Sequence, residues 1–271
     1  MRVASPYLLG YAAAEQDRLV RQSSLLAPLT ERFFRAAGIG TAQRVLEIGS
    51  GMGDVAHIAA RLVGPTGNVV GVERDATSVA RARERTDTTG LRHVSFVHAD
   101  VDRWVAADTF DAVVGRFVLN HSHDVPALLR ALSRSVRHRG VIAFQEVAFS
   151  PALAVAGRVP LWRAVLAVLE ATLTGSGLDP DLGLSLHRLF QDAGLPAPHV
   201  HLEIPFAPDD TVIRLEVDLV RTLRGVAEEH GVSLASLGDL DTLVERIQAQ
   251  ALTTRAPIGF AGVMSVWSRV P

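Results

Sequence analysis

Short apolar runs alternate with amphipathic stretches along the middle of the chain, between about residues 41 and 148. Buried parallel strands appear in a sequence as compact runs rich in Val, Ile and Phe, whereas helices place apolar residues three and four positions apart. Strands that alternate with helices at short intervals favour a parallel sheet with helices on both faces. We therefore expect five strands, at residues 44–48, 68–73, 93–99, 110–114 and 141–147.

Helical spacing of apolar residues predicts two helices within this region, at 76–86 and 125–138, the second closed by Arg139-Gly140 as a C-terminal cap. Another helix is expected before the region, at 15–37. Beyond it, the pattern predicts helices at 161–173, 182–193, 211–230 and 240–252, and strands at 199–206 and 258–270. The first five strands are the firmest part of this prediction.

Composition narrows the class of protein. The 271 residues carry a net charge of −2 and contain no basic run, so a nucleic-acid partner is not expected. The chain has no cysteine, which removes disulfides and thiolate chemistry and suits a cytoplasmic location. The apolar stretch at 151–169 is interrupted by Arg158, Pro160 and Arg163, so no membrane span is expected. The first 14 residues are interpreted as part of the mature protein rather than a signal peptide.

The segment from Val45 to Asp54 reads VLEIGSGMGD, a strand that runs into alternating glycines and then a helix. Glycines without side chains let a ligand lie against the backbone, and the free N–H groups of the following helix favour an anionic group. Asp54 stands where the dinucleotide pattern has its third glycine, so a nicotinamide cofactor fits poorly. With Glu47 before the turn, the segment resembles the first motif of the class I S-adenosylmethionine-dependent methyltransferases.

That resemblance implies an α/β fold: a Rossmann-like, doubly wound seven-stranded sheet whose last two strands are antiparallel neighbours, with an added helical lid. Applied to this chain, it gives an N-terminal helical cap (1–40), a cofactor-binding core (41–148) and remaining core strands with inserted lid helices (149–271), as one domain overall. It also implies S-adenosylmethionine as the cofactor and a small molecule as the partner. A homodimer stays open.

Residues after each strand are candidates for holding the cofactor. Glu73, 24 residues past Gly49, would accept hydrogen bonds from the ribose hydroxyls; alternatively it pairs with Arg74 at the surface. By resemblance, Asp100 would contact the adenine amino group; alternatively it caps a helix containing Trp104. Arg116 would meet the cofactor carboxylate or form a salt bridge at the sheet edge, and Gln22 is a weak candidate for the same end of the cofactor. The expected cofactor-binding residues are Glu47, Gly49, Ser50, Gly51, Glu73, Arg74, Asp100, Val101 and Arg116.

The expected catalytic residues are His121, Glu146 and Tyr11. The cofactor supplies the activated methyl group, so the protein must align an acceptor and manage one proton. His121 is the first candidate for the base, since imidazole titrates near working pH, and a role that only shapes the pocket has equal weight. Glu146 is a second base or a substrate acceptor of hydrogen bonds. Tyr11 resembles an N-terminal tyrosine that covers the cofactor in some small-molecule methyltransferases; alternatively it anchors the N-terminus.

The loop after the fourth strand contains His121, His123 and Asp124, which could chelate a metal, although His123 is expected to face solvent and Asp124 to cap the next helix. The residues after that strand, GRFV, lack the Asn/Asp-Pro-Pro-aromatic tetrapeptide of amino-group methyltransferases. We therefore expect methyl transfer to a small, rather hydrophobic acceptor at O, N or C, in specialised metabolism. The alternatives are a non-methylating, cyclase-like enzyme with the same cofactor, a nicotinamide-dependent oxidoreductase and a noncatalytic binding protein.

Overall fold

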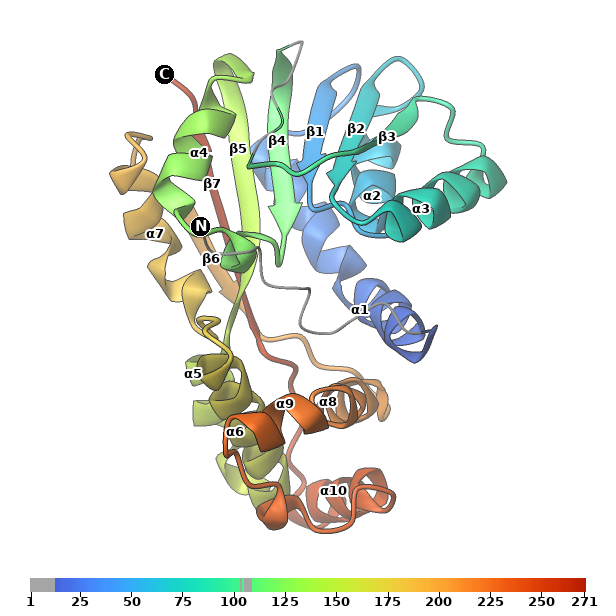
Figure 1. Cartoon of the computed structure of the whole chain (residues 1–271), viewed down its shortest axis with the longest axis vertical. Helices are drawn as coiled ribbons and strands as arrows, with labels where there is room; N and C mark the ends of the chain where they lie inside the picture. The colour runs from blue at the N-terminus through green and yellow to red at the C-terminus, as the bar shows by residue number, and fades with distance from the viewer. Residues whose placement is uncertain (1–12, 103, 105–108) are drawn as a thin grey trace. The chain divides into compact units, whose positions relative to one another are not determined.

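Seven strands form one mixed sheet, in the order β3-β2-β1-β4-β5-β7-β6 (Figure 1). The computed structural model describes residues 13–102, 104 and 109–271, and all statements below refer to these. The chain divides into two units. The sheet unit comprises Leu26–Glu146, Leu182–Leu202 and Met264–Pro271, and the helical unit comprises residues 13–25, Val147–Asp181 and Glu203–Val263.

The central strands of the sheet are parallel, as predicted. β1 pairs with β2 and β4, β2 with β3, and β4 with β5. The predicted strands 44–48 and 68–73 match β1 and β2 residue for residue, and β3 is one residue shorter than predicted at each end. The bounds are β1 Arg44–Ile48, β2 Asn68–Glu73, β3 Val94–His98, β4 Phe110–Arg116, β5 Val136–Ala148, β6 His199–Glu203 and β7 Gly262–Arg269.

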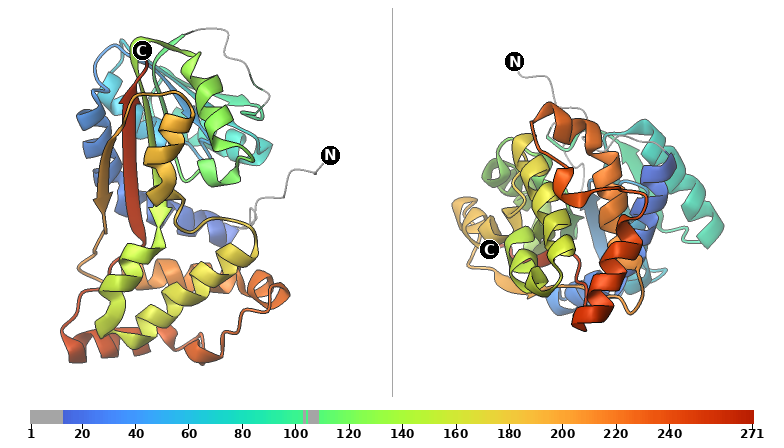
Figure 2. Two further views of the ribbon diagram at one scale, coloured as in Figure 1. Left: turned by 90° about the vertical axis from the view of Figure 1, so that its left-hand side faces the viewer. Right: turned by 90° about the horizontal axis from the view of Figure 1, so that it is seen from below.

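Helices cover both faces of the sheet (Figure 2), and an apolar layer lies between helices and sheet on each face. Side chains of a strand point alternately to opposite faces. Val45 therefore packs with α1 (Ala13–Ala37), α2 (Asp54–Val63) and α3 (Ala76–Thr89), while Leu46 and Ile48 pack with α4 (Val125–Ser133) and α7 (Leu182–Asp192). Both layers are fully buried at their centres, which confirms the doubly wound α/β prediction.

The strand order reverses between β1 and β4, because the chain first moves outward from β1 to β3 and then returns to place β4 on the other side of β1. In open α/β sheets the carboxyl ends of the strands at such a point leave a crevice where ligands bind. The loops after β1 and β4 meet there, so this edge of the sheet is the expected position of a ligand site.

The helix predicted at 125–138 is wrong at its end. α4 stops at Ser133, and Val136 already belongs to β5. Arg139 has a φ of +62° and lies inside β5, where the pairing with β4 shifts register between Phe110 and Ala112. A Cβ on Gly140 would lie 2.7 Å from the carbonyl oxygen of Asp111. Arg139-Gly140 therefore forms an irregularity of the β-bulge kind rather than a helix cap.

β7 runs antiparallel to β5. The N–H of Val270 donates to the carbonyl of Gly140 (2.9 Å), and the side chain of Gln145 donates to Ser265 (2.8 Å). Residue numbers thus rise along one strand while they fall along the other. β7 lies between β5 and β6, and because it is antiparallel to β5 the sheet is mixed. β6 ends at Glu203, earlier than the predicted 206, and β7 begins at Gly262, later than the predicted 258.

The helical unit is built around α6 (Pro160–Gly175), which contacts α5 (Phe149–Val155), α8 (Thr211–Thr222), α9 (Arg224–Glu229) and α10 (Leu243–Thr254). Trp162, Leu166 and Leu169 of α6 are 0–1% exposed. The single helix predicted at 211–230 is two helices that meet at Leu223, and α5 was not predicted. The helices expected to form a lid belong to this unit except α7, which packs on the sheet.

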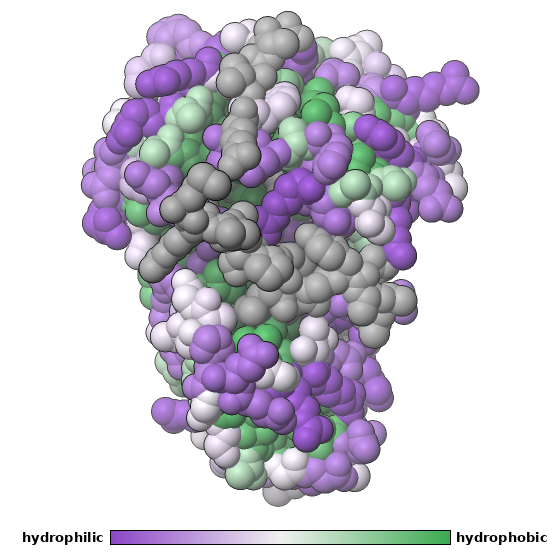
Figure 3. All heavy atoms as spheres, viewed as in Figure 1, coloured by the Kyte–Doolittle hydropathy of each residue, from purple (hydrophilic) through white to green (hydrophobic). Residues whose placement is uncertain are grey.

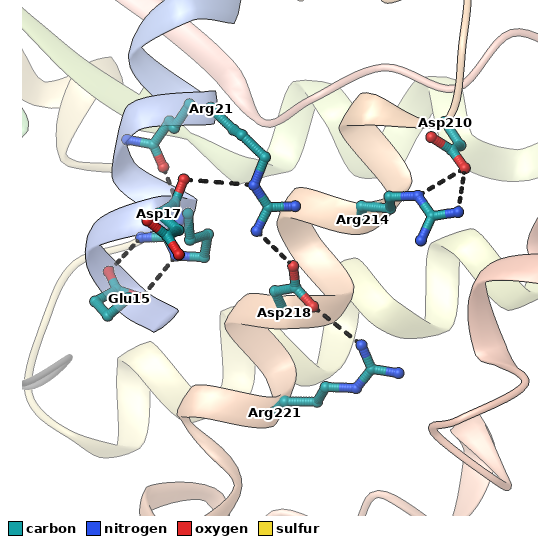
Figure 4. Close-up of polar contacts among 9 residues, drawn as sticks. Glu15, Asp17, Arg21, Asp210, Arg214, Asp218 and Arg221 are labelled. Atoms are coloured by element: carbon teal, nitrogen blue, oxygen red, sulfur yellow. Dashed lines mark hydrogen bonds and ion pairs between the residues drawn. The ribbon is translucent and has the colours of Figure 1, made fainter. Parts of the chain in front are cut away.

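Several ion pairs connect side chains of α1 and α8 within the helical unit (Figure 4). Arg21 of α1 pairs with Asp218 of α8 at 2.7 Å, and Asp218 also accepts from Arg221. Arg18 and Glu15 of α1 form a buried pair through two hydrogen bonds of 2.7 and 2.8 Å. On the face of the molecule in Figure 3, hydrophilic residues predominate and apolar ones are scattered among them. No helix in the described residues is long and apolar enough to cross a membrane.

Candidate active site

The glycine-rich loop between β1 and α2 is closed at its first glycine and open at its second. Gly49 and Gly51 have φ values of +64° and +48°, in the region that favours glycine. A Cβ on Gly49 would lie 2.3 Å from Cγ2 of Val118, so the segment after β4 packs directly against the loop. A Cβ on Gly51 would meet no atom of the described residues within 4 Å. The open side leaves room for a ligand against the backbone.

Arg85 of α3 fixes the far side of this loop. It donates to the carbonyl of Met52 (2.7 Å) and to the carboxylate of Asp54 (2.6 Å). Asp54, the residue that set this loop apart from the dinucleotide pattern, thus anchors the start of α2 to α3. Sequence reasoning missed Arg85 because nothing in its own helix distinguishes it from the neighbouring arginines; the bond depends on the packing of α3 beside the loop.

Glu73 reaches the loop from the end of β2. One carboxylate oxygen accepts from the N–H of Gly51 and the other from the N–H of Asp75, each at 2.9 Å. A carboxylate oxygen can accept more than one hydrogen bond, so both keep capacity for a further donor. The carbonyl of Glu73 accepts from the N–H of Ala99, which brings the segment after β3 to the same edge. The alternative was a surface ion pair between Glu73 and Arg74. In the described residues the Glu73 carboxylate instead bonds the backbone N–H groups of Gly51 and Asp75.

The segment after β3 forms a turn at this edge. The carboxylate of exposed Asp100 accepts from the N–H of Asp102 (3.1 Å), and its carbonyl accepts from the N–H of Trp104 (2.8 Å). Val101 is half-buried beside it. Arg74 is exposed, and its carbonyl bonds the ring of His98 at 3.0 Å. The expected helix around Trp104 lies largely outside the described residues.

Two buried side-chain oxygens at the glycine loop have no hydrogen-bond partner among the described residues. Ser50 and Glu47 are 5% and 1% exposed, and the Ser50 hydroxyl and one Glu47 oxygen have no partner in the described structure. Burial raises the pKa of Glu47 well above its ordinary value, although the nearby Arg116 guanidinium opposes this effect. Burial also lowers the pKa of Arg116, opposed by Asp54 and Glu47, yet arginine remains a cation in proteins. A carboxyl group and a guanidinium therefore lie near each other beside the loop.

His121 lies in the short 3₁₀ helix η1 (Leu119–His121) that follows β4. It is half-buried, and burial together with the charge of Arg74 lowers its pKa below the ordinary 6.5. The imidazole is therefore neutral near pH 7, the state a base requires. Arg74 and His121, which lie far apart in sequence, are thus brought to one side of the site.

Glu146 supports the turn that carries His121. One of its oxygens accepts from the N–H groups of Val118 (2.8 Å) and Leu119 (2.7 Å), at the start of η1. The other oxygen is buried and has no hydrogen-bond partner among the residues that the structure describes. Burial raises the pKa of Glu146 to about 8, even though the two backbone N–H groups favour its charged form. Glu146 therefore carries a proton at neutral pH.

The remaining candidate residues are those of the loop after β4, Gln22 and Tyr11. Asp124 accepts from the N–H of Ala127 at the start of α4, which confirms its expected capping role, and His123 is exposed, as expected. No group of three metal-ligating side chains occurs in the described part of the chain. Gln22 lies in the helical unit and accepts from Arg18 at 2.8 Å. Tyr11 lies outside the described residues.

A doubly wound sheet with this loop, and with an acid at the end of β2, is the architecture of a class I S-adenosylmethionine-dependent methyltransferase. Residues 39–175, just over half of the chain, match the family described as "Methyltransferase domain", and the chain belongs to that family. Its cofactor is S-adenosylmethionine; two solved structures with this fold hold S-adenosylhomocysteine. Family membership also separates the chain from the nicotinamide-dependent oxidoreductases.

The chain is similar over part of its length to curated methyltransferases. An arsenite methyltransferase of Aquipseudomonas alcaligenes is 32% identical over 112 residues, covering 38% of this chain and 32% of the relative. The ubiquinone/menaquinone biosynthesis C-methyltransferase UbiE of Cellvibrio japonicus is 32% identical over 121 residues, covering 44% of this chain and 49% of the relative. The match spans a third to a half of these relatives.

The fold as a whole is shared more widely than the sequence. The [4+2]-cyclase SpnF superposes with a TM-score of 0.56 at 19% identity, covering 90% of this chain and 81% of that one. At this identity the likeness concerns the fold alone.

The residues present fit the cofactor. The space beside Gly51 is open, and unpartnered oxygens of Ser50 and Glu47 lie at the same loop. Glu73 keeps acceptor capacity at the end of β2, where a ribose would need it. Leaving two buried oxygens unpaired costs free energy, about 1–3 kcal/mol each, which a ligand that donates hydrogen bonds would recover.

Proposed function

We propose that the chain transfers the methyl group of S-adenosylmethionine to a small, rather hydrophobic acceptor, at an O, N or C centre, in specialised metabolism. The observation that carries this proposal is the pairing of an open glycine loop with a neutral His121 at the carboxyl edge of one sheet. The names of the two curated relatives, which refer to arsenite and to ubiquinone or menaquinone biosynthesis, favour a small acceptor.

In this proposal the two ends of the cofactor are held by different strands. Glu73 accepts hydrogen bonds from the ribose hydroxyls, Asp100 and Val101 border the adenine, and Arg74 lies beside them. Gly49, Ser50 and Gly51 provide the backbone against which the cofactor rests. Glu47 and Arg116 face the ammonium and carboxylate of its aminoacyl end, since an acid beside a guanidinium complements a zwitterion.

The bound cofactor supplies an activated methyl group, and the chain's own residues position the acceptor and move one proton. His121 takes the proton of the acceptor on its unprotonated ring nitrogen. Glu146, protonated at neutral pH, does not compete for that proton; it holds the η1 turn through Val118 and Leu119. Tyr11 stays a predicted cover for the cofactor.

The further expectations are part of the same proposal. We expect a cytoplasmic protein that acts on a small molecule without nucleic acid or membrane as a partner, either alone or as a homodimer. The near-neutral charge and the absence of cysteine support these expectations. The division into 1–40, 41–148 and 149–271 also stays a prediction.

The first test is a calorimetric titration with S-adenosylhomocysteine, with NAD as the competitor. Replacement Glu73→Ala should weaken binding by about 1–3 kcal/mol, roughly 5- to 150-fold, because buried hydroxyls lose a charged acceptor. Glu84→Ala, which removes the same charge from an exposed position on α3, is the matched control and should bind like the wild type. Equal affinity in wild type and Glu73→Ala would remove Glu73 from the site.

The second test is product analysis with candidate acceptors and S-adenosylmethionine. Formation of S-adenosylhomocysteine together with a methylated product supports methyl transfer. Conversion of an acceptor without S-adenosylhomocysteine would replace the proposal by the cyclase-like alternative, for which the shared fold with SpnF leaves room.

A further inference from the structure

A row of polar side chains crosses one buried face of the sheet. Val45, Ala112 and Ala143 belong to the apolar layer beneath α1, α2 and α3. Because side chains alternate along a strand, residues two or four positions further on lie on the same face. The positions that follow them on this face, at the carboxyl edge, are Glu47 of β1, Arg116 of β4 and Gln145 of β5; β7 adds Ser265, which bonds Gln145. A polar row thus replaces the apolar layer at this edge.

Thr30 of α1 joins this row through hydrogen bonds that all run in one direction, from Arg116 through Thr30 and Gln145 to Ser265. Arg116 donates to the hydroxyl of Thr30 on α1 (2.9 Å), and that hydroxyl donates to the side-chain oxygen of Gln145 (2.7 Å). The amide nitrogen of Gln145 then donates to the hydroxyl of Ser265 (2.8 Å). Arginine can only donate, so its bond to Thr30 fixes the direction of the Thr30 hydroxyl and, through it, the orientation of the Gln145 amide.

The row is deeply buried: Thr30, Gln145 and Ser265 are 0–2% exposed. Apolar side chains of similar size would fill these positions without needing partners, and replacing both partners of a buried hydrogen bond by apolar groups is often nearly neutral for stability. Stability alone therefore gives little reason for the row. Its polar bonds end on Arg116, the guanidinium that interacts electrostatically with Glu47 and Asp54 at the glycine loop.

We propose that Thr30, Gln145 and Ser265 are positioning residues that hold the Arg116 guanidinium beside Glu47, so that this pair recognises the zwitterionic aminoacyl end of the cofactor. The inference rests on the proposed function and deepens it, since it assigns recognition of one end of the cofactor to a hydrogen-bonded row that begins on α1 and β7. Affinity for the nucleoside end is independent of the row.

Two ligands separate the ends. S-adenosylhomocysteine carries the aminoacyl group, and 5′-methylthioadenosine carries the same nucleoside and sulfur without it. Dissociation constants for both are measured by calorimetry in the full chain and in Thr30→Val, Gln145→Met and Ser265→Ala. Thr30→Val should weaken S-adenosylhomocysteine about 5- to 30-fold, with smaller losses further along the row, and leave 5′-methylthioadenosine within about twofold.

Three controls keep the test decisive. Thr86→Val removes another buried hydroxyl of the same unit, on α3, and should leave both affinities unchanged. Thr30→Ser keeps the hydroxyl and should bind like the wild type. If Thr30→Val does not fold, Gln145→Met, which removes the bonds to Thr30 and Ser265, carries the test. Adding Thr30→Val to Arg116→Met should cause no further loss of S-adenosylhomocysteine affinity, because the row acts through Arg116.

The outcomes separate this inference from the proposed function. Parallel losses for both ligands would show a general structural role, and unchanged affinities would show that Arg116 needs no support; either result overturns the inference. Failure of the wild type to bind either ligand would instead overturn the proposed cofactor site. A selective loss of S-adenosylhomocysteine affinity that Thr30→Ser restores supports the positioning role.

Discussion

The sheet unit and the helical unit both bury charged groups, but they satisfy them differently. In the helical unit, Arg18 and Glu15 bind each other through two short hydrogen bonds, and one oxygen of Glu216 is the buried atom without a partner in the described part of that unit. In the described part of the sheet unit, Nε1 of Trp267 on β7 and side-chain oxygens of Glu47, Ser50 and Glu146 are buried without a partner, and the three oxygens lie where β1 and β5 end. Isolated unpaired atoms are tolerated in folded proteins, whereas three oxygens at the carboxyl edge of the sheet are what the proposed cofactor site would require.

The two units each contain a buried glutamate whose pKa is raised. Burial raises the pKa of Glu146 to about 8 and that of Glu216 to about 7. Arg18 and the N–H of Ala261 oppose the shift at Glu216, whereas two backbone N–H groups oppose it at Glu146. Burial thus raises the pKa of a carboxyl group in each unit, and of the two groups Glu146 is the one beside the turn that carries a candidate base.

The largest expected effect is on catalysis. His121→Ala should reduce kcat by about 10²- to 10⁴-fold if His121 is the base, with unchanged affinity for S-adenosylhomocysteine. A base works in its neutral form, so the wild-type rate should fall as pH drops through a pKa below 6.5, and this acid limb should vanish in the variant. Rates and binding are measured from pH 5 to 8. Identical pH profiles would reduce His121 to a residue that lines the pocket.

The next effect concerns Glu146 and stability. Its folded pKa of about 8 exceeds the ordinary 4.5, so the folded state binds the proton more tightly than the unfolded state. The stabilisation this gives is fully present below pH 4.5 and is lost as pH rises towards 8. Glu146→Gln, which cannot ionise, should therefore gain stability relative to the wild type by about 2–4 kcal/mol between pH 5 and pH 8.

Hydrogen exchange measured by mass spectrometry checks this prediction, because it resolves the sheet unit from the helical unit. Glu216→Gln is the matched control: its protection should change with the same sign but in the helical unit, and less, because its pKa is raised only to about 7. A pH-independent difference between Glu146→Gln and wild type would show that Glu146 is ionised in the fold.

The two units also differ in how accurately the sequence predicted the bounds of their helices and strands. β1 and β2 were predicted to the residue because central parallel strands are continuous apolar runs bounded by glycine turns. The end of α4 was wrong because Val136 fits the spacing of a helix and of a strand, and because Gly140 resembles a helix cap. In the helical unit, helical periodicity continues across Leu223, so the sequence predicted one helix where two exist.

For the site, sequence placed the residues at the ends of strands but not their partners. Glu73, Asp100, Arg116 and Glu146 follow from strand ends, since parallel strands bring those ends to one edge. Thr30 and Ser265 lie 115 and 120 residues from Gln145 along the chain, and they meet only after α1 and β7 pack on the sheet. Tertiary packing, which periodicity does not encode, decides such bonds.

The smallest expected effect tests the surface of the helical unit. The guanidinium of Arg21 and the carboxylate of Asp218 are 41% and 30% exposed, so solvent and salt screen their 2.7 Å contact (Figure 4). Arg21→Ala should change the free energy of unfolding by about 0.2–1 kcal/mol at most, and less in high salt. Denaturant titration at two salt concentrations measures this change. A loss of several kcal/mol would mean that the ion pairs, rather than the apolar contacts around α6, hold α1 and α8 within this unit.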